Sequence, residues 1–116
     1  MTPLGVKLRA LREEKGVTMS QMAEALEVTP AYLSALEHGN RGRPTTLRLH
    51  QMCAYFVIIW DEADDLRRLA DISHPKVTID TSGLSPEATE LANRLADQIG
   101  ELCEAKIEAM LEMLKR

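Results

Sequence analysis

The apolar residues of this chain recur at intervals of three and four over most of its length, which is the pattern of amphipathic helices. The pattern is clearest over residues 18–37, where it divides into two short segments with one apolar face each: Met22, Ala23 and Leu26 in the first, Leu33 and Leu36 in the second. Only Glu27 and Val28 separate the two segments. We therefore expect two helices joined by a tight turn, within an all-α fold.

Both segments carry helix start signals. Thr18 is placed to cap the first helix, and Gln21 three residues later completes a capping box. Thr29 is placed to cap the second helix, with Pro30 at the first helical position, where its missing N–H group is not needed. Two short helices joined in this way form a helix-turn-helix unit.

Further helices are predicted on both sides of this unit, at residues 3–15, 45–56 and 61–72. With the two central helices they make a five-helix domain over residues 1–72. Residues 73–84 follow as a linker, in which the alternating stretch 76–80 favours a short strand. A lone strand needs a partner, and its copy in a second subunit would supply one.

A last helix is predicted from residue 86 to about residue 115, in a C-terminal segment of residues 85–116. Such a helix would be about 45 Å long, too long to bury its apolar stripe on a small domain. We therefore expect it to pack against its own copy as a dimerisation helix. The stripe consists of Leu91, Leu95, Ile99, Leu102, Ile107 and Met110. The alternative is a helix folded back across its own domain.

The motifs between about residues 4 and 70 resemble the Cro/cI (XRE-like) family of helix-turn-helix regulators. The matching positions are Leu8–Arg12, Lys15–Thr18, Met22, Ala23, Leu26, Val28, Thr29, Tyr32–Ser34, Leu36, Glu37 and Gly39. The resemblance implies a five-helix, lambda-repressor-like DNA-binding domain. Two positions depart from the family: Glu27 stands in the turn where Gly is frequent, and Met19 stands where Gln is frequent.

The resemblance also implies roles for residues. A recognition helix at about residues 30–38 would place its first residues on base edges in the major groove, and the apolar Pro30, Ala31 and Ala35 would suit thymine methyl groups. Arg12 would pair with Glu37 and tie the first helix to the recognition helix, and its alternative is contact with a DNA phosphate. The candidate DNA-binding residues are Thr18, Met19, Gln21, Thr29, Pro30, Ala31, Tyr32, Ser34, Ala35, His38, Asn40, Arg41 and Arg43.

Two of these residues, Arg41 and Arg43, lie in a glycine-containing turn after the recognition helix and are placed to clamp the DNA backbone or to enter a minor groove. The alternative for this turn is a solvated loop. Tyr32 would reach a phosphate or a base edge, and its alternative is a ring packed on the preceding helix.

The distribution of charge along the chain, and not the net charge, bears on whether the partner is a nucleic acid. The chain carries a formal charge of −4, which by itself argues against a nucleic-acid partner. Residues 1–60, however, hold seven Lys and Arg against five acids, whereas residues 61–116 hold seven against thirteen. A DNA-facing first half and an acidic second half would produce this division.

Several classes of protein find no support in the residues. No stretch approaches the roughly 20 apolar residues of a membrane span, and no signal peptide is evident. We find no nucleophile–base pair and no phosphate loop, and His50 with Cys53 lacks the further ligands that a metal needs. We therefore expect a cytoplasmic protein of the bacterial cytosol or nucleoid, without catalytic residues, metal or cofactor.

The sequence thus predicts a sequence-specific DNA-binding transcriptional regulator, most simply a repressor, that binds a pseudo-palindromic operator in double-stranded DNA as a homodimer. One alternative is an antitoxin-type or partner-binding regulator whose C-terminal helix holds another protein. The other is a structural helical dimerisation module without DNA binding.

Overall fold

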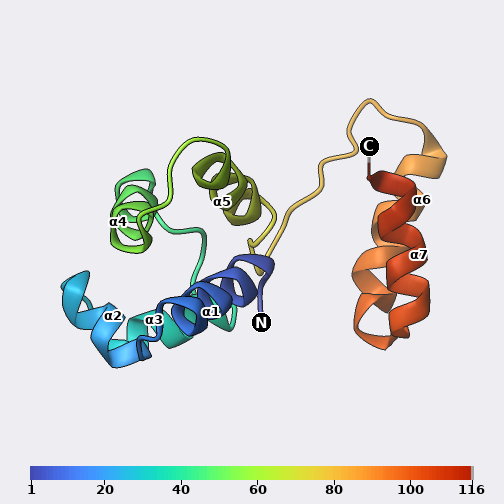
Figure 1. Cartoon of the computed structure of the whole chain (residues 1–116). Coiled ribbons are helices and arrows are strands. Elements are labelled where there is room, and N and C mark those ends of the chain that lie inside the picture. Colours follow the sequence, from blue (N-terminus) through green and yellow to red (C-terminus); the bar gives the residue numbers. More distant parts are fainter. Residues whose placement is uncertain (116) are drawn as a thin grey trace. The chain divides into compact units, whose positions relative to one another are not determined.

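The computed structural model describes residues 1–115, and all of their regular secondary structure is helical, as predicted. The chain divides into two compact units, Met1–Val77 and Thr78–Arg116 (Figure 1). Within residues 1–115 no strand forms, and no helix there is long and apolar enough to cross a membrane.

Five helices make up the first unit. They are α1 (Pro3–Lys15), α2 (Met19–Ala25), α3 (Pro30–Glu37), α4 (Thr46–Phe56) and α5 (Asp61–Asp71). A threonine hydroxyl caps each of the first four by accepting a backbone N–H from the first turn. The start signals expected at Thr18 and Thr29 therefore operate, and α1, α3, α4 and α5 each end within a residue of the expected position.

Thirteen apolar residues from all five helices and the α4–α5 connection are buried in one core. The largest of them that are almost inaccessible are Leu4, Leu8, Met22, Leu33, Leu49, Met52 and Leu66. The core thus lies beneath α2 and α3 and holds them against α1. The apolar connection from α4 to α5 contributes little to this core. Its residues Val57, Ile59 and Trp60 are exposed, and only Ile58 is buried.

The segment after α5 closes the first unit. Ser73 is buried, and its hydroxyl accepts a hydrogen bond of 2.8 Å from the Leu4 backbone N–H while donating to the Leu69 carbonyl. It thereby joins the end of α5 to the start of α1. The strand expected at residues 76–80 is absent, because an isolated alternating stretch has no neighbour to pair with in the described chain.

The second unit is a pair of helices and not the single long helix expected from the sequence (Figure 1). Helix α6 (Pro86–Gln98) passes into one 3₁₀ turn, η1 (Ile99–Glu101), and α7 (Glu104–Leu114) follows. Leu102 and Cys103 have extended backbone, with ψ angles of 138° and 159°, which ends the helix and reverses the chain. Gly100 weakens helix formation just before this point.

Candidate nucleic-acid interface

The connection between α2 and α3 is as tight as the sequence predicts. Thr18 and Gln21 form the expected capping box at the start of α2, with hydrogen bonds of 2.8 and 3.1 Å. After α2 the Val28 N–H donates to the Ala23 carbonyl at 2.9 Å. Glu27 takes the left-handed conformation, with φ of 58°. The turn therefore keeps a backbone suited to glycine although a glutamate occupies it.

Helix α3 has one buried face and one accessible face. Leu33, Leu36 and Glu37 are buried. The accessible side carries Pro30 and Ala31, which are exposed, together with half-buried Tyr32, Ser34 and Ala35. The Pro30 ring fixes the backbone φ angle and Thr29 caps the Tyr32 N–H at 3.1 Å, so the first turn of α3 is well defined. The accessible face thus presents small side chains that would let a partner approach closely.

A buried ion pair holds α3 against α1. Both guanidinium nitrogens of Arg12 donate to the Glu37 carboxylate, one of them at 3.2 Å, and both residues are buried. The expected Arg12–Glu37 pair is therefore confirmed, and Arg12 is not available to DNA. A bidentate arginine–carboxylate contact fixes direction as well as distance, so it sets how α3 lies on α1.

Gly5 permits the close crossing of these two helices. A Cβ atom on Gly5 would lie 2.3 Å from the Glu37 carbonyl oxygen and 2.8 Å from its Cα atom. The same carbonyl accepts a 3.0 Å hydrogen bond from the Thr2 N–H. Sequence reasoning did not identify Gly5, and its only signal is a glycine inside a helix that otherwise needs none.

Tyr32 lies between two arginines on the accessible side of α3. The guanidinium carbon of Arg41 lies 5.2 Å from the ring centroid, and that of Arg48 lies 5.6 Å from it. Arg48 also donates to the Leu26 carbonyl at 3.2 Å and to the Gln51 side chain at 2.8 Å. These contacts link the end of α2, the first turns of α4 and the third residue of α3.

The other polar candidates in the turn after α3 have separate surroundings. Arg43 donates to Asp71 at 2.8 Å and to the Pro44 carbonyl at 3.1 Å, so its side chain joins the turn to α5. His38 bonds the Ser34 carbonyl through Nδ1 at 2.8 Å. Because a carbonyl only accepts, Nδ1 carries the proton and Nε2 remains for another partner. Asn40 and Arg41 are exposed.

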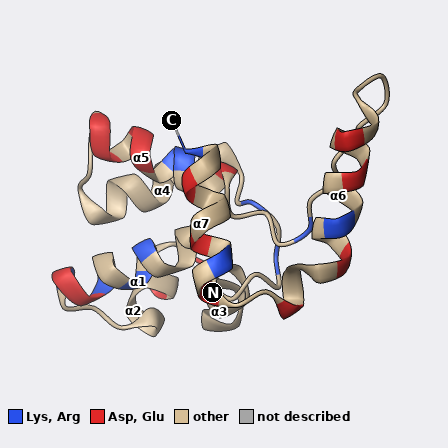
Figure 2. Cartoon of the chain, turned by 90° about the vertical axis from the view of Figure 1, so that its right-hand side faces the viewer, with Lys and Arg blue, Asp and Glu red and all other residues tan. Residues whose placement is uncertain are grey.

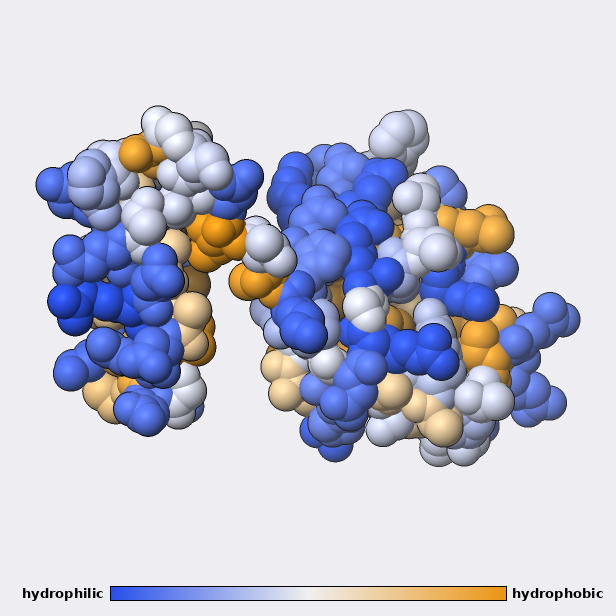
Figure 3. All heavy atoms as spheres, turned by 180° about the vertical axis from the view of Figure 1, so that it is seen from behind, coloured by the Kyte–Doolittle hydropathy of each residue, from blue (hydrophilic) through white to orange (hydrophobic). Residues whose placement is uncertain are grey.

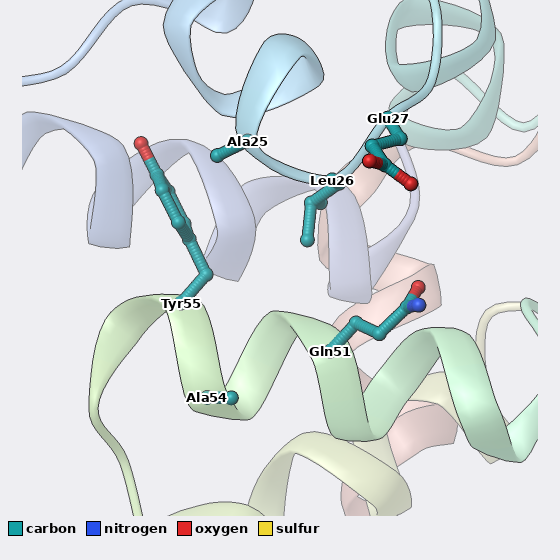
Figure 4. Close-up of a pocket in the computed structure, with 6 residues that line it drawn as sticks. All are labelled: Ala25, Leu26, Glu27, Gln51, Ala54 and Tyr55. Atoms are coloured by element: carbon teal, nitrogen blue, oxygen red, sulfur yellow. The ribbon is translucent and has the colours of Figure 1, made fainter.

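A shallow groove of about 360 Å³ lies between α2 and α4, beside the α2–α3 turn. It is lined by Ala25, Leu26, Glu27, Gln51, Ala54 and Tyr55 (Figure 4). Glu27, Gln51 and Tyr55 supply its polar side-chain atoms, and the Gln51 oxygen already accepts from Arg48 (Figure 4). Among residues 1–115, no three His, Cys, Asp or Glu side chains group as metal ligands, here or elsewhere.

All thirteen candidate DNA-binding residues belong to the first unit, at the start of α2, along α3 and in the turn after it. The six candidate dimerisation residues lie together in the second unit, around an apolar groove of about 260 Å³ between α6 and α7. Arg48 and Ser73 were not identified as candidates. Their contacts span 22 and 69 positions of sequence, which no local motif signals.

A family model described as a helix-turn-helix domain matches residues 3–57. The chain carries a helix-turn-helix domain. The resemblance seen in the sequence is thereby confirmed at this level, and α2 with α3 form the motif itself.

Two proteins that are similar to this chain are named as transcriptional regulators. The chain is 29% identical over 107 residues to the HTH-type transcriptional regulator RamB of Mycobacterium tuberculosis, covering 88% of this chain and 22% of RamB. It is 42% identical over 50 residues to the HTH-type transcriptional repressor RghR of Bacillus subtilis, covering 41% of this chain and 37% of RghR. The chain thus spans about a fifth of RamB and less than half of RghR. No solved structure matches it.

Proposed function

We propose that this chain is a DNA-binding transcriptional regulator whose α3 enters the major groove. The observation that carries the proposal is the accessible face of α3. Its small side chains sit at the start of a capped helix that the buried Arg12–Glu37 pair holds rigidly. A recognition helix needs this combination, because its first residues must approach base edges closely and in a fixed register.

The residues of this face have distinct proposed roles. Pro30, Ala31 and Ala35 lie over bases and contact thymine methyl groups or sense DNA shape. The N–H groups that Thr18 and Thr29 leave uncapped at the starts of α2 and α3 hold phosphate oxygens. The side chains of Met19, Gln21, Ser34, His38 and Asn40 lie along the same elements and contact the backbone at the edges of the groove.

Arg43 has a smaller part in DNA binding than the sequence alone indicates. Its guanidinium is engaged by Asp71 at 2.8 Å and by the Pro44 carbonyl. A surface ion pair contributes at most about 1 kcal/mol, so a phosphate could compete for Arg43. Its first role is nevertheless to hold the turn that carries Arg41.

We propose further that the chain acts as a homodimer joined through the second unit. No residue of α6, η1 or α7 is buried, although both helices have apolar faces. Leu91, Ile99, Leu111, Met113 and Leu114 are among the exposed large apolar side chains. Figure 3 shows hydrophobic side chains at the surface of both units.

A second copy of the hairpin is the occupant that best fits this groove. Two hairpins, each with helices of 13 and 11 residues and one apolar face, complete a four-helix bundle about a two-fold axis. The charged residues of the unit are mostly acidic, with eight Asp and Glu against four Lys and Arg, and Figure 2 shows the acidic residues along α6. An acidic outer surface is repelled by phosphates, which suits a dimerisation unit directed away from DNA.

Two linked helix-turn-helix domains imply a pseudo-palindromic operator with half-sites about one helical turn apart. Linkage makes the second contact intramolecular and can raise affinity about 10²- to 10⁴-fold. Such a dimer would act most simply as a repressor by covering the DNA it binds. The name of RghR as a repressor is in keeping with this direction of control.

The same apolar groove favours one other function, a regulator whose hairpin holds a different protein. Size-exclusion chromatography with light scattering distinguishes the two. A homodimer of the purified chain supports the four-helix bundle, whereas a monomer that associates only with a co-expressed protein supports the alternative.

DNA binding is tested by selection from a pool of random duplexes, followed by anisotropy titration of the selected duplex at several salt concentrations. We expect one enriched palindromic motif, and we expect Ala31→Asp to abolish its binding by placing a carboxylate against DNA. Ala54→Asp, an equally small exposed site on α4, should bind as the unchanged chain does. Enrichment of no sequence and no salt-dependent binding would refute the proposal.

Interface residues are tested by a second matched pair. Leu95→Asp places a charge in the apolar groove and should give a monomer with operator affinity about 10²- to 10⁴-fold lower. Ala96→Asp, at the neighbouring exposed position, should leave the dimer intact. A dimer that survives Leu95→Asp would place the interface elsewhere.

A further inference from the structure

The three arginines around the recognition helix differ in what holds them. Arg48 is bound to the Leu26 carbonyl and to Gln51, and Arg43 is bound to Asp71 and Pro44. Arg41 is exposed, and within residues 1–115 its guanidinium makes no hydrogen bond or ion pair and lies over the Tyr32 ring. The first two guanidinium groups therefore serve the fold, while the donors of the third are available to a partner.

The contact with Tyr32 decides where the Arg41 guanidinium lies. Arg41 follows α3 in sequence, but Tyr32 is the third residue of α3. A distance of 5.2 Å to the ring centroid brings the guanidinium back from the C-terminal turn to the N-terminal half of the helix. This is the half that a recognition helix directs at base edges.

The ring itself is well fixed. Tyr32 is half-buried and packs against the core, its N–H is capped by Thr29, and Arg48 covers its ring from 5.6 Å. Since Arg48 is anchored by two hydrogen bonds, Tyr32 has little freedom to move. A guanidinium that stacks on such a ring loses little further freedom when it binds, and stacking leaves its in-plane N–H groups available.

From these contacts we propose that Arg41 reads a guanine in the major groove, and that Tyr32 is the residue that positions it. The inference rests on the proposed DNA binding by α3. Two coplanar N–H donors of a guanidinium match the O6 and N7 acceptors of guanine, and this is the commonest specific contact of arginine with a base edge. The apolar residues of α3 cannot supply such a contact, because they carry no side-chain donor.

The test begins with the motif that the full-length chain selects from random duplexes. We expect one guanine per half-site whose enrichment depends on Arg41. Replacing that guanine by 7-deazaguanine removes only the N7 acceptor in the major groove, and should weaken binding about 5- to 150-fold. Replacing it by inosine removes only the minor-groove amino group and should leave binding unchanged.

Substitutions of Arg41 and Tyr32 show which residue is responsible for the preference for this guanine. Arg41→Ala should lose the preference at this position and the sensitivity to 7-deazaguanine, while keeping the rest of the motif. Arg41→Lys, which lacks the planar group that stacks on Tyr32, should weaken the preference. Tyr32→Phe keeps the ring and should keep the preference, whereas Tyr32→Leu should reduce it. Arg68→Ala, which removes an exposed arginine of α5 that is paired with Asp65, is the matched control and should select the same guanine.

Three results would overturn the inference. Arg41→Ala could select the unchanged motif with unchanged 7-deazaguanine sensitivity. It could instead weaken all sequences alike and reduce the slope of log K against log salt by about 0.9, which identifies a phosphate contact. Sensitivity to inosine and not to 7-deazaguanine would identify a minor-groove contact. If the unchanged chain selects no motif, DNA recognition itself fails, which is a different outcome.

Discussion

The two units of this chain use the same helical pattern and reach different states of burial. The first unit buries thirteen apolar side chains and the Arg12–Glu37 pair among five helices. The second unit has comparable apolar faces on α6 and α7, yet none of its described residues is buried. An amphipathic pattern thus identifies a helix, but burial depends on whether the same chain supplies a surface to cover it.

This difference assigns separate tasks to the units. A unit with its own core presents a recognition surface in a fixed geometry, and its stability depends on contacts within one chain. A hairpin with an uncovered apolar groove depends on a second molecule, so its stability depends on protein concentration. Substitutions in the first unit should therefore change unfolding, and substitutions in the groove should change association.

The largest effect on stability is expected at Glu37. Glu37→Ala leaves Arg12 charged and buried without a partner and should destabilise the first unit by about 3–5 kcal/mol. Urea denaturation followed by circular dichroism measures the change. Replacing both residues, Arg12→Met with Glu37→Leu, removes the unpaired charge and should recover most of the loss. A loss below 1 kcal/mol for Glu37→Ala would show that the pair does not hold α3.

The next effect is expected at Gly5. Gly5→Ala forces a Cβ atom to within 2.3 Å of the Glu37 carbonyl oxygen, so α1 and α3 must separate, at about 1–3 kcal/mol. Gly100 in the hairpin is the matched control, because a Cβ atom there meets nothing within 4 Å. Gly100→Ala should not destabilise the chain in the same denaturation experiment. Equal effects at the two sites would contradict the close helix crossing.

Glu27 offers a smaller effect of opposite sign. Its φ of 58° is strained for a residue with a side chain, so Glu27→Gly should stabilise the first unit by about 0.5–1 kcal/mol. Glu27→Ala keeps the Cβ atom and should give no such gain. Glu108→Gly, within α7, should instead destabilise its helix by about 1 kcal/mol. A loss of stability for Glu27→Gly would show that the Glu27 side chain has a role of its own.

The smallest effect is expected at the surface of the hairpin. Arg94 and Glu90 form an ion pair of 2.6 Å with both side chains more than 60% exposed. Glu90→Ala should change stability by no more than about 0.5 kcal/mol, in contrast to Glu37→Ala in the first unit. A thermal melt at low and at high salt checks it, and a change of several kcal/mol would mean that this face is buried in the dimer.

Local chemistry made the first unit predictable. The caps at Thr18 and Thr29 and Pro30 at the first helical position each specify a helix start from a few adjacent residues. The Arg12–Glu37 pair was expected from the family resemblance alone. Gly5 and the contacts of Arg43 with Asp71 depend on how helices meet, which local patterns do not encode.

The sequence did not predict the α6–α7 hairpin, because the residues between the two helices carry only a weak helix-ending signal. A glycine inside a helical pattern is frequently tolerated, and Leu102 continues the apolar stripe, so one helix fitted the spacing. The stripe shifts by one position at Cys103, where the extended backbone in fact begins a new helix. No strand forms at residues 76–80 of the single chain, since alternation without a neighbouring strand does not suffice, and the pairing of this stretch with its copy in a second subunit stays a prediction.

Sedimentation of the full chain beside a chain that ends at Leu84 tests the division of tasks most directly. We predict that the full chain sediments as a dimer. The shortened chain should keep its cooperative unfolding, sediment as a monomer, and bind the selected duplex about 10²- to 10⁴-fold more weakly with its salt sensitivity retained. A shortened chain that still dimerises and binds as tightly as the full chain would contradict the account.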